Sequence, residues 1–206
     1  ACITSMDADH LDIYDSHEDL KETFKEFAGR VKSSKSLYVR YGLPLEGISF
    51  GLDANAQVYA QNIRVADGGY IFDINVEGTV VPSVRFALPG YHNIANALAA
   101  FAMALNVCET KEQLANALSS FQGVHRRFSY RLKSPKVLID DYAHHPTELD
   151  AAIAAARELY PDRKLTGVFQ PHLFSRTRDF VDGFARSLEK LDKLFLQEIP
   201  FTKSST

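Results

Sequence analysis

The chain has 206 residues, of which 46% are hydrophobic and 24% charged, and its formal net charge is −3. This length allows about one or two domains, and the composition excludes a disordered or collagen-like chain. The slightly negative charge argues against a general nucleic-acid binder, because a phosphate backbone requires a basic surface. Cys2 and Cys108 are too few for a disulfide framework and lack metal-binding spacing, which favours reduced thiols in a cytoplasmic protein.

Neither a membrane span nor an export signal is evident. The longest apolar stretch, from Ile94 to Val107, is interrupted by two asparagines and is too short to cross a bilayer. The first residues lack the basic region and apolar core of a signal peptide, and they are typical of a strand already in progress. We therefore expect a chain that begins inside a domain.

The first half of the chain predicts a β-rich region followed by two helices. Apolar residues at helical spacing predict one early helix, from Ser16 to about Val31. Turn signals at Asp67–Gly69 and Glu77–Gly78 separate the later β segments, which predicts that residues 48–88 form antiparallel hairpins. Strands are expected at 1–4, 36–41, 48–51, 57–65, 70–76 and 80–88, and further helices at 94–106 and 111–121. The first of these two later helices is apolar nearly all round and should be buried.

Strands and helices alternate in the second half, after a connection at residues 123–128. Strands are expected at 128–132, 136–140, 164–169 and 193–196, and helices at 146–160 and 178–191. Such alternation predicts an α/β domain with a parallel, doubly wound sheet. We therefore expect two domains, residues 1–123 and residues 124–206.

Polar and charged side chains concentrate where two strands of the second half end. The first group is Asp140, Asp141, Tyr142, His144 and His145, and the second lies within residues 170–178. In open α/β sheets, ligands bind beyond the carboxyl ends of the strands. Together with Arg126 and Arg127, whose guanidinium groups suit carboxylates and phosphates, these groups predict a site for an anionic substrate. The alternative for any single residue is a loop cap or a solvated charge.

Two weaker patterns occur in the first half. The carboxylates of residues 7–12, together with His10, resemble a site for a hard cation such as Mg²⁺, although helix-capping carboxylates in a solvated loop explain them about as well. His92, Asn93 and Asn96 open an apolar helix, either as caps or as side chains that read an adenine edge. No G-x-x-x-x-G-K-[ST], G-x-G-x-x-G or G-x-S-x-G segment occurs, so a Walker loop for ATP would lie outside this chain.

Five motifs occur in order along nearly the whole chain. They are D-H-L-D at residues 9–12, G-x-H-N-x-x-N-A-x-x-A at 90–100, R-R-F at 126–128, D-D-Y-A-H-H-P-T-E at 140–148 and F-Q-P-H-x-x-S-R-T-R-D at 169–179. Together they resemble the motifs of the Mur ligase family. The first two are widespread in that family, whereas the last two are typical of its L-alanine-adding members. The member that recycles murein tripeptide usually lacks the last one.

The resemblance implies a ligase of three domains: one that binds UDP, a central ATPase domain and a Rossmann-like C-terminal domain. Residues 1–123 would be the later part of the central domain, with an antiparallel β block and without the P-loop. Residues 124–206 would be an incomplete C-terminal domain, although residues 198–202 depart from the Y-x-A-R-E pattern of the family. The implied reaction joins L-alanine to the carboxylate of UDP-N-acetylmuramate through an acyl phosphate. It would use ATP and Mg²⁺ in cytoplasmic peptidoglycan synthesis.

The resemblance also implies roles for single residues at the ATP end of the site. His10 would help to hold Mg²⁺, and Asn93 and Asn96 would face the adenine. Arg127 would reach the ATP phosphates, and Asp141 would contact the ribose.

At the alanine end, the resemblance implies that Tyr142, His144 and Arg176 line the site. The implied catalytic residues are Arg127, His144 and Arg176. Leu173 stands where many relatives have an Arg, so any contact of that Arg is absent or replaced here. His145 and His172 match the motifs and are expected to have structural roles only.

Three alternatives stay open at this point. The chain could belong to the ligase that recycles murein tripeptide. It could be a metal hydrolase, with a site built from Asp140, Asp141, His144 and His145. It could also be a non-catalytic binding module derived from a ligase. Nucleic acid and membrane are not expected as partners, and the sequence does not indicate an oligomeric state.

Overall fold

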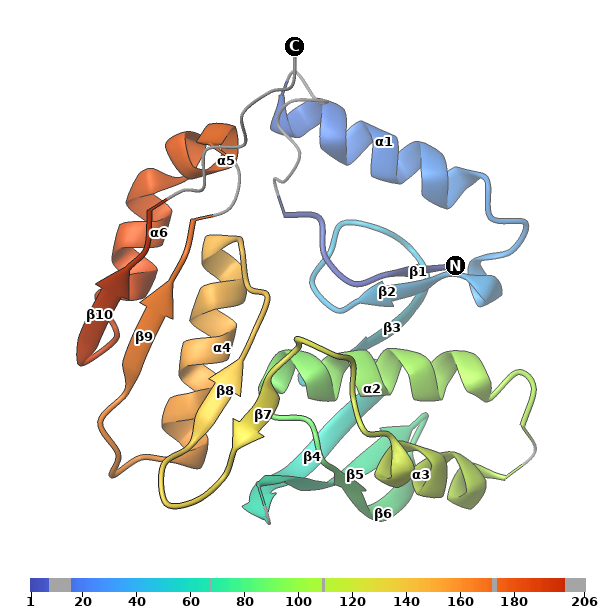
Figure 1. Ribbon diagram of the computed structural model, residues 1–206. Helices are drawn as coiled ribbons and strands as arrows, with labels where there is room; N and C mark the ends of the chain where they lie inside the picture. Colours follow the sequence, from blue (N-terminus) through green and yellow to red (C-terminus); the bar gives the residue numbers. More distant parts are fainter. Residues whose placement is uncertain (8–15, 67, 109, 172–173, 199–206) are drawn as a thin grey trace. The chain divides into compact units, whose positions relative to one another are not determined.

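The computed structural model describes residues 1–7, 16–66, 68–108, 110–171 and 174–198 (Figure 1). The chain divides into two compact units, Ala1–Gln122 and Gly123–Thr206. No helix in these described segments has the length and apolar character that crossing a bilayer requires. Both units combine helices with strands, so the predicted α/β class is confirmed.

The first unit is built on a six-stranded sheet in the order β1-β2-β3-β4-β5-β6. Its strands are β1 (Cys2–Ile3), β2 (Tyr38–Arg40), β3 (Ile48–Gly51), β4 (Val58–Ala66), β5 (Gly69–Val76) and β6 (Thr79–Phe86). The pairs β1–β2, β2–β3 and β3–β4 are parallel, whereas β4–β5 and β5–β6 are antiparallel hairpins. The predicted hairpins are therefore confirmed for β4–β6.

The same prediction is wrong for β3, which runs parallel to both β2 and β4. The loop 41–47 connects β2 to β3. It contains Gly42, whose φ of +93° is a conformation that favours glycine. Gly47 closes this loop directly against β2. A Cβ there would lie 2.6 Å from the carbonyl oxygen of Leu37. Turn signals do not reveal this close approach of the backbone, which accompanies the parallel pairing of β2 and β3.

Helices cover the sheet of the first unit. They are α1 (His17–Gly29), α2 (Tyr91–Ala104) and α3 (Lys111–Ser120), and a short 3₁₀ helix, η1 (Ser34–Ser36), precedes β2. α2 contacts β2, β3 and β4, and α3 lies along β6 (Figure 1). Ile94, Leu98 and Phe101 of α2 are buried against Phe50 and Phe72 of the sheet. Burial of each such side chain contributes about 1.5–3 kcal/mol, which makes α2 the buried helix that its composition predicts.

The second unit contains two strand pairs among its described residues. The elements are β7 (Ser129–Leu132), β8 (Leu138–Asp140), α4 (Pro146–Leu159), β9 (Thr166–Phe169), α5 (Phe174–Asp179), α6 (Val181–Leu188) and β10 (Lys193–Leu196). β9 and β10 are parallel and are joined through α5 and α6, whereas β7 and β8 are antiparallel. α4 packs through Ala155 and Ala156 on Phe128, Tyr130 and Ile139.

The helix expected at 178–191 is found as α6, and the helix that precedes it, α5, is not expected from the sequence. They meet at Phe180, whose φ of −119° and ψ of 20° are not helical. The Phe180 ring packs edge-on against His145, with 4.8 Å between the ring centroids. A tertiary contact therefore accompanies the break, and helical periodicity alone does not detect it.

Candidate functional site

The candidate site of the second unit is the loop that leaves β8 and enters α4. Pro146 occupies the first turn of α4, where its fixed φ and missing N–H are favourable. His145 is the N-cap, and its Nδ1 accepts a hydrogen bond from the Thr147 amide at 3.3 Å. The Nε2 atom of His145 is buried and has no hydrogen-bond partner among the residues that the structure describes. These contacts agree with the structural role expected for His145.

Asp141 organises this loop through its two carboxylate oxygens. One oxygen accepts a hydrogen bond from the backbone N–H of Phe128 at 2.7 Å, and the other accepts one from that of Ala143 at 2.8 Å. Phe128 and Arg126 both have left-handed backbones, with φ of +47° and +60°. Asp141 thus joins the segment before β7 to the loop after β8. Each oxygen still has a second lone pair that a ligand hydroxyl could use.

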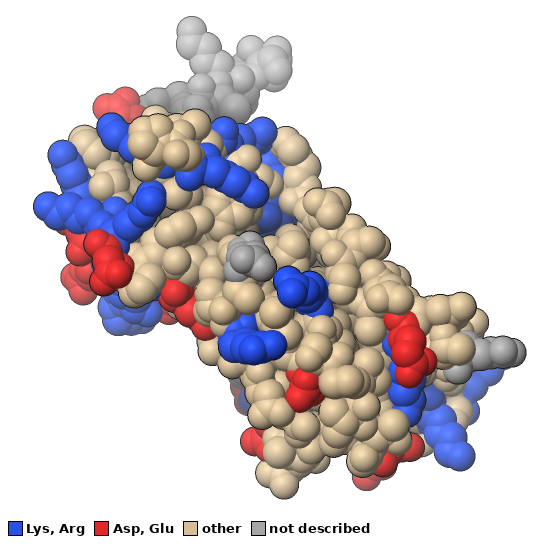
Figure 2. Space-filling view, turned by 90° about the horizontal axis from the view of Figure 1, so that it is seen from below, with Lys and Arg blue, Asp and Glu red and all other residues tan. Residues whose placement is uncertain are grey.

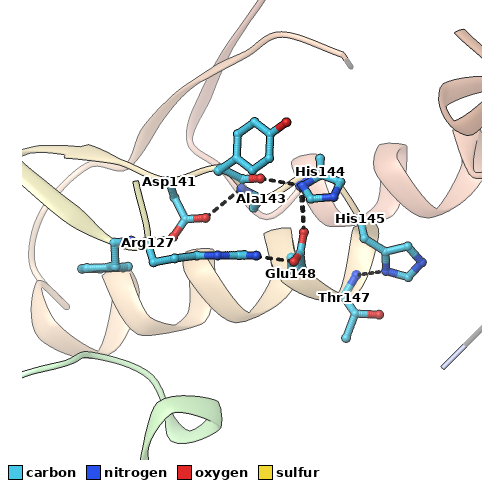
Figure 3. A network of polar contacts seen from close by, with 9 residues as sticks. Arg127, Asp141, Ala143, His144, His145, Thr147 and Glu148 are labelled. Carbon is cyan, nitrogen blue, oxygen red and sulfur yellow. Dashed lines mark hydrogen bonds and ion pairs between the residues drawn. The ribbon is translucent and has the colours of Figure 1, made fainter. Parts of the chain in front are cut away.

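Glu148, on the first turn of α4, links Arg127 to His144 (Figure 3). Its Oε1 accepts from Arg127 Nη1 at 3.0 Å, and its Oε2 accepts from the His144 backbone N–H at 2.9 Å. Burial raises the pKa of the Glu148 carboxyl, but the hydrogen bonds from His144 and Arg127 lower it by more. The pKa of Glu148 therefore lies below its ordinary value.

Tyr142 and His144 form an aromatic pair beside Arg126. Their ring centroids are 4.9 Å apart, and the Arg126 guanidinium carbon lies 4.6 Å from the centre of the Tyr142 ring. The Tyr142 N–H donates to the Arg126 carbonyl at 2.9 Å. His144 Nδ1 is 2.8 Å from the Tyr142 carbonyl oxygen, which only accepts, so Nδ1 carries the hydrogen and Nε2 of a neutral ring is an acceptor.

Asp140, the last residue of β8, forms an ion pair with Arg131 and not with the residues of the loop described above. Its Oδ2 accepts from Arg131 Nη2 at 2.7 Å and from Arg131 Nε at 3.2 Å. The hydrogen bond and charge of Arg131 hold the pKa of the Asp140 carboxyl below its usual range. The described part of the chain contains no group of three or more His, Cys, Asp or Glu side chains that could hold a metal ion. The metal-hydrolase alternative therefore gains no support from Asp140, Asp141, His144 and His145.

Asn93 and Asn96 lie in the first unit, one turn apart near the start of α2. Asn93 Nδ2 donates to the Pro89 carbonyl at 2.7 Å, which fixes its amide and leaves its oxygen as an acceptor. Asn96 is exposed. Gly90, the N-cap of α2, has a φ of +94°, and its N–H donates to the buried Tyr70 hydroxyl at 3.0 Å. The N-cap Gly90 offers no side chain to cap α2, and the Asn93 amide is held by the preceding turn.

Part of the predicted site lies outside the described residues. This applies to His10, His172 and Leu173, and to the side chain of Arg176 on α5. The structure brings Arg127, Asp141, Tyr142 and His144 together in one cluster of the second unit. Asn93 and Asn96 belong to the other unit.

Arg126 is predicted as part of the site, but the sequence patterns assign no role to Glu148 and do not reveal the backbone conformation of Arg126. A signal for Glu148 was present, since an acidic residue three positions after an N-cap is typical of a capping box. Here the carboxylate reaches the His144 amide, one residue before the N-cap. The left-handed backbone of Arg126 has no such signal, because this conformation favours Gly and the sequence has Arg.

A cavity of about 480 Å³ lies elsewhere in the second unit. It is lined by residues before β8, at the start of β9 and at the end of α4, including Lys136, Arg157, Arg163 and Lys164. Arg157 is paired with Asp192 at 2.8 Å. Figure 2 shows groups of Lys and Arg side chains and groups of Asp and Glu side chains on a face that is otherwise mostly uncharged. The cavity adjoins the amino ends of β8 and β9, whereas the candidate loop follows the carboxyl end of β8, so the cavity is not part of this site.

Known proteins resemble nearly the whole chain. Residues 1–104 match the family model of the Mur ligase middle domain, and residues 126–203 match that of the Mur ligase, glutamate ligase domain. The chain is 51% identical to the UDP-N-acetylmuramate–L-alanine ligase of Flavobacterium johnsoniae, over 97% of this chain and 44% of that protein. It is 42% identical to the ligase of the same name from Porphyromonas gingivalis, over 97% of this chain and 46% of that protein.

Solved structures agree with these sequence matches. The UDP-N-acetylmuramate-alanine ligase MurC from Thermotoga maritima has a TM-score of 0.78 and 25% identity, over 97% of this chain and 45% of that one. The MurF ligase from the same organism, in complex with ADP, has a TM-score of 0.75 and 16% identity, over 93% of this chain and 46% of that one, and shares the fold. The chain thus spans less than half the length of these relatives. The two family models and these likenesses show that the chain belongs to the Mur ligase family.

Proposed function

We propose that this chain is part of an ATP-dependent ligase that joins L-alanine to the carboxylate of UDP-N-acetylmuramate in cytoplasmic peptidoglycan synthesis. The observation that carries the proposal is the 51% identity to a UDP-N-acetylmuramate–L-alanine ligase over 97% of the chain. In this proposal, residues 1–123 belong to the middle, ATP-binding domain and residues 124–206 to the C-terminal domain. The P-loop lies elsewhere in the longer protein, since this chain has no Walker motif.

The proposed reaction has two steps. The muramate carboxylate attacks the γ-phosphorus of ATP, and the bond to ADP breaks, which leaves an acyl phosphate. The amine of L-alanine then attacks the acyl carbon, and the tetrahedral intermediate expels phosphate to leave an amide. Charge neutralisation and positioning are the main tasks of the protein in both steps.

Residues from both units serve ATP in this proposal. The fixed amide of Asn93 leaves an oxygen that suits the adenine amino group, and Asn96 lies one turn away. Arg127 donates to Glu148 through one nitrogen, and the five N–H donors of a guanidinium leave others for phosphate oxygens. Asp141 would accept from a ribose hydroxyl with its free lone pairs. Mg²⁺ would neutralise phosphate charge, with His10 among its ligands.

L-Alanine would bind beside Tyr142, His144 and Arg176. An Arg at this end suits the alanine carboxylate, which it can bind through two parallel hydrogen bonds. Alanine arrives as an ammonium ion and must lose a proton before its amine attacks. His144 is suited to accept that proton at Nε2, because its Nδ1–H is held by the Tyr142 carbonyl.

The test is phosphate release by the full gene product with Mg-ATP, UDP-N-acetylmuramate and L-alanine, each omitted in turn. The proposal predicts release only when all three substrates are present. Release that continues without UDP-N-acetylmuramate or without L-alanine would contradict it. No release under any condition would instead favour the non-catalytic binding module.

A further inference from the structure

Glu148 contacts two residues to which the proposed function gives different substrates. Arg127 is assigned to the phosphates of ATP and His144 to L-alanine. Each carboxylate oxygen of Glu148 serves one of them, Oε1 at 3.0 Å from Arg127 Nη1 and Oε2 at 2.9 Å from the His144 N–H. A single side chain therefore ties together the two ends of the candidate site (Figure 3).

The position of Glu148 on α4 fixes its carboxylate between Arg127 and His144. Glu148 lies on the first turn of α4, after a proline and a capped start, so its backbone is well fixed. The Arg127 side chain is 51% exposed, and without a partner such a long side chain would sample many rotamers. The His144 Nδ1 lies 3.4 Å from Glu148 Oε2, on the same side as the Tyr142 carbonyl. Both neighbours of Nδ1 are acceptors, which keeps the hydrogen on Nδ1 and the free lone pair on Nε2.

We propose that Glu148 is a positioning residue that orients Arg127 toward ATP and His144 toward L-alanine through one shared carboxylate. This proposal rests on the proposed function. It predicts that a change at Glu148 impairs the use of both substrates at once. A glutamate that only capped α4 would affect the stability of the fold and leave substrate use unchanged.

Glu148→Gln is the sharpest variant, because glutamine has the same size but one acceptor oxygen in place of two. Its NH₂ group must face one donor, either Arg127 or the His144 amide, so that contact is lost. The other contact is weakened, because its acceptor no longer carries a charge. Asp150→Asn is the matched control. It lies on the same helix and removes an ion pair to Lys190, at 2.7 Å, without contacting Arg127 or His144.

The experiment measures kcat, KM for ATP, KM for L-alanine and Tm in the full gene product. The loss of a charged hydrogen bond predicts a fall of about tenfold in kcat/KM for each of the two substrates in E148Q. D150N should keep both kcat/KM values, whatever its Tm. A change in E148Q that is confined to Tm, or to one of the two substrates, would overturn the proposal.

A second measurement separates this proposal from the proposed function. If the wild-type protein makes no amide from L-alanine, the proposed function fails, and the guanidinium of Arg127 still reports on Glu148. Rotation of that guanidinium, followed by NMR with ¹⁵N-labelled arginine, should be restricted in the wild type and in D150N and faster in E148Q. Equal rotation in all three proteins would overturn the positioning role.

Discussion

At the residue scale, Asp141 connects two segments of the second unit through hydrogen bonds to their backbone. Its two oxygens accept hydrogen bonds from the backbone of Phe128 and of Ala143, which belong to different segments. In the proposed function Asp141 contacts the ribose, and in the structure its carboxylate holds the loop between β8 and α4 in shape. Asp140, next to it in sequence, pairs with Arg131 instead and does not contact the loop backbone.

Asp141→Asn should therefore destabilise the fold as well as impair ATP use. The asparagine has one acceptor oxygen, so one of the two amides is left unpaired. The free energy of unfolding should fall by about 1–3 kcal/mol. Asp140→Asn is the control, and its effect should be smaller because Asp140 lies in an exposed ion pair. Urea unfolding of both variants tests this, and equal losses of stability would contradict the role given to Asp141.

At the element scale, Asp73 of β5 accepts hydrogen bonds at a register shift on each side of its strand. The register shifts between Gln61 and Arg64 in the β4–β5 pair, and between Phe72 and Ile74 in the β5–β6 pair. The Asp73 carboxylate accepts from the Ser83 backbone N–H and from Asn62 Nδ2, both at 2.8 Å. These hydrogen bonds, that from Ser83 first, lower the pKa of Asp73.

Asp73→Ala should lower the free energy of unfolding by about 1–2 kcal/mol, because two hydrogen bonds at the bulges are lost. Ser83→Gly is the informative comparison. Ser83 has a φ of +55°, and its hydrogen bond to Asp73 uses the backbone N–H, so glycine keeps that bond and relieves the left-handed strain. S83G should be as stable as the wild type or more so. If urea unfolding found S83G as unstable as D73A, the account of these bulges would be wrong.

Elements that local signals define were predictable from the sequence. The β4–β6 hairpins follow from their turn residues, and α2 follows from its apolar composition. The direction of β3 and the break between α5 and α6 are accompanied by tertiary contacts of Gly47 and Phe180, which local signals do not reveal. The motifs named most of the cluster at the start of α4. The contacts of Glu148 depend on a side-chain arrangement that spacing does not reveal.

At the scale of the whole molecule, the two units differ in how their carboxylates are held. Asp140, Glu148, Asp150 and Asp192 of the second unit have lowered pKa values. In the first unit, the carboxyl of Asp73 has a lowered pKa. A carboxyl whose pKa is lower in the native state stabilises the fold above its unfolded pKa, near 4, and this stabilisation is lost as the pH falls through the native pKa.

Acid should therefore weaken the second unit more than the first. Hydrogen exchange of each unit, measured at neutral pH and at about pH 3 and corrected for intrinsic rates, tests this expectation. The amides of α4 and β9 should lose more protection than those of α2 and β5. An equal loss in both units, or a larger loss in the first, would contradict it.

The identity of the accepted amino compound tests the central claim most directly. The measurement is kcat/KM of the full gene product for L-alanine and for L-Ala-γ-D-Glu-meso-diaminopimelate, each with Mg-ATP and UDP-N-acetylmuramate. The account predicts amide formation with L-alanine and a kcat/KM far above that for the tripeptide. A preference for the tripeptide would contradict the account and assign the chain to the ligase that recycles murein tripeptide.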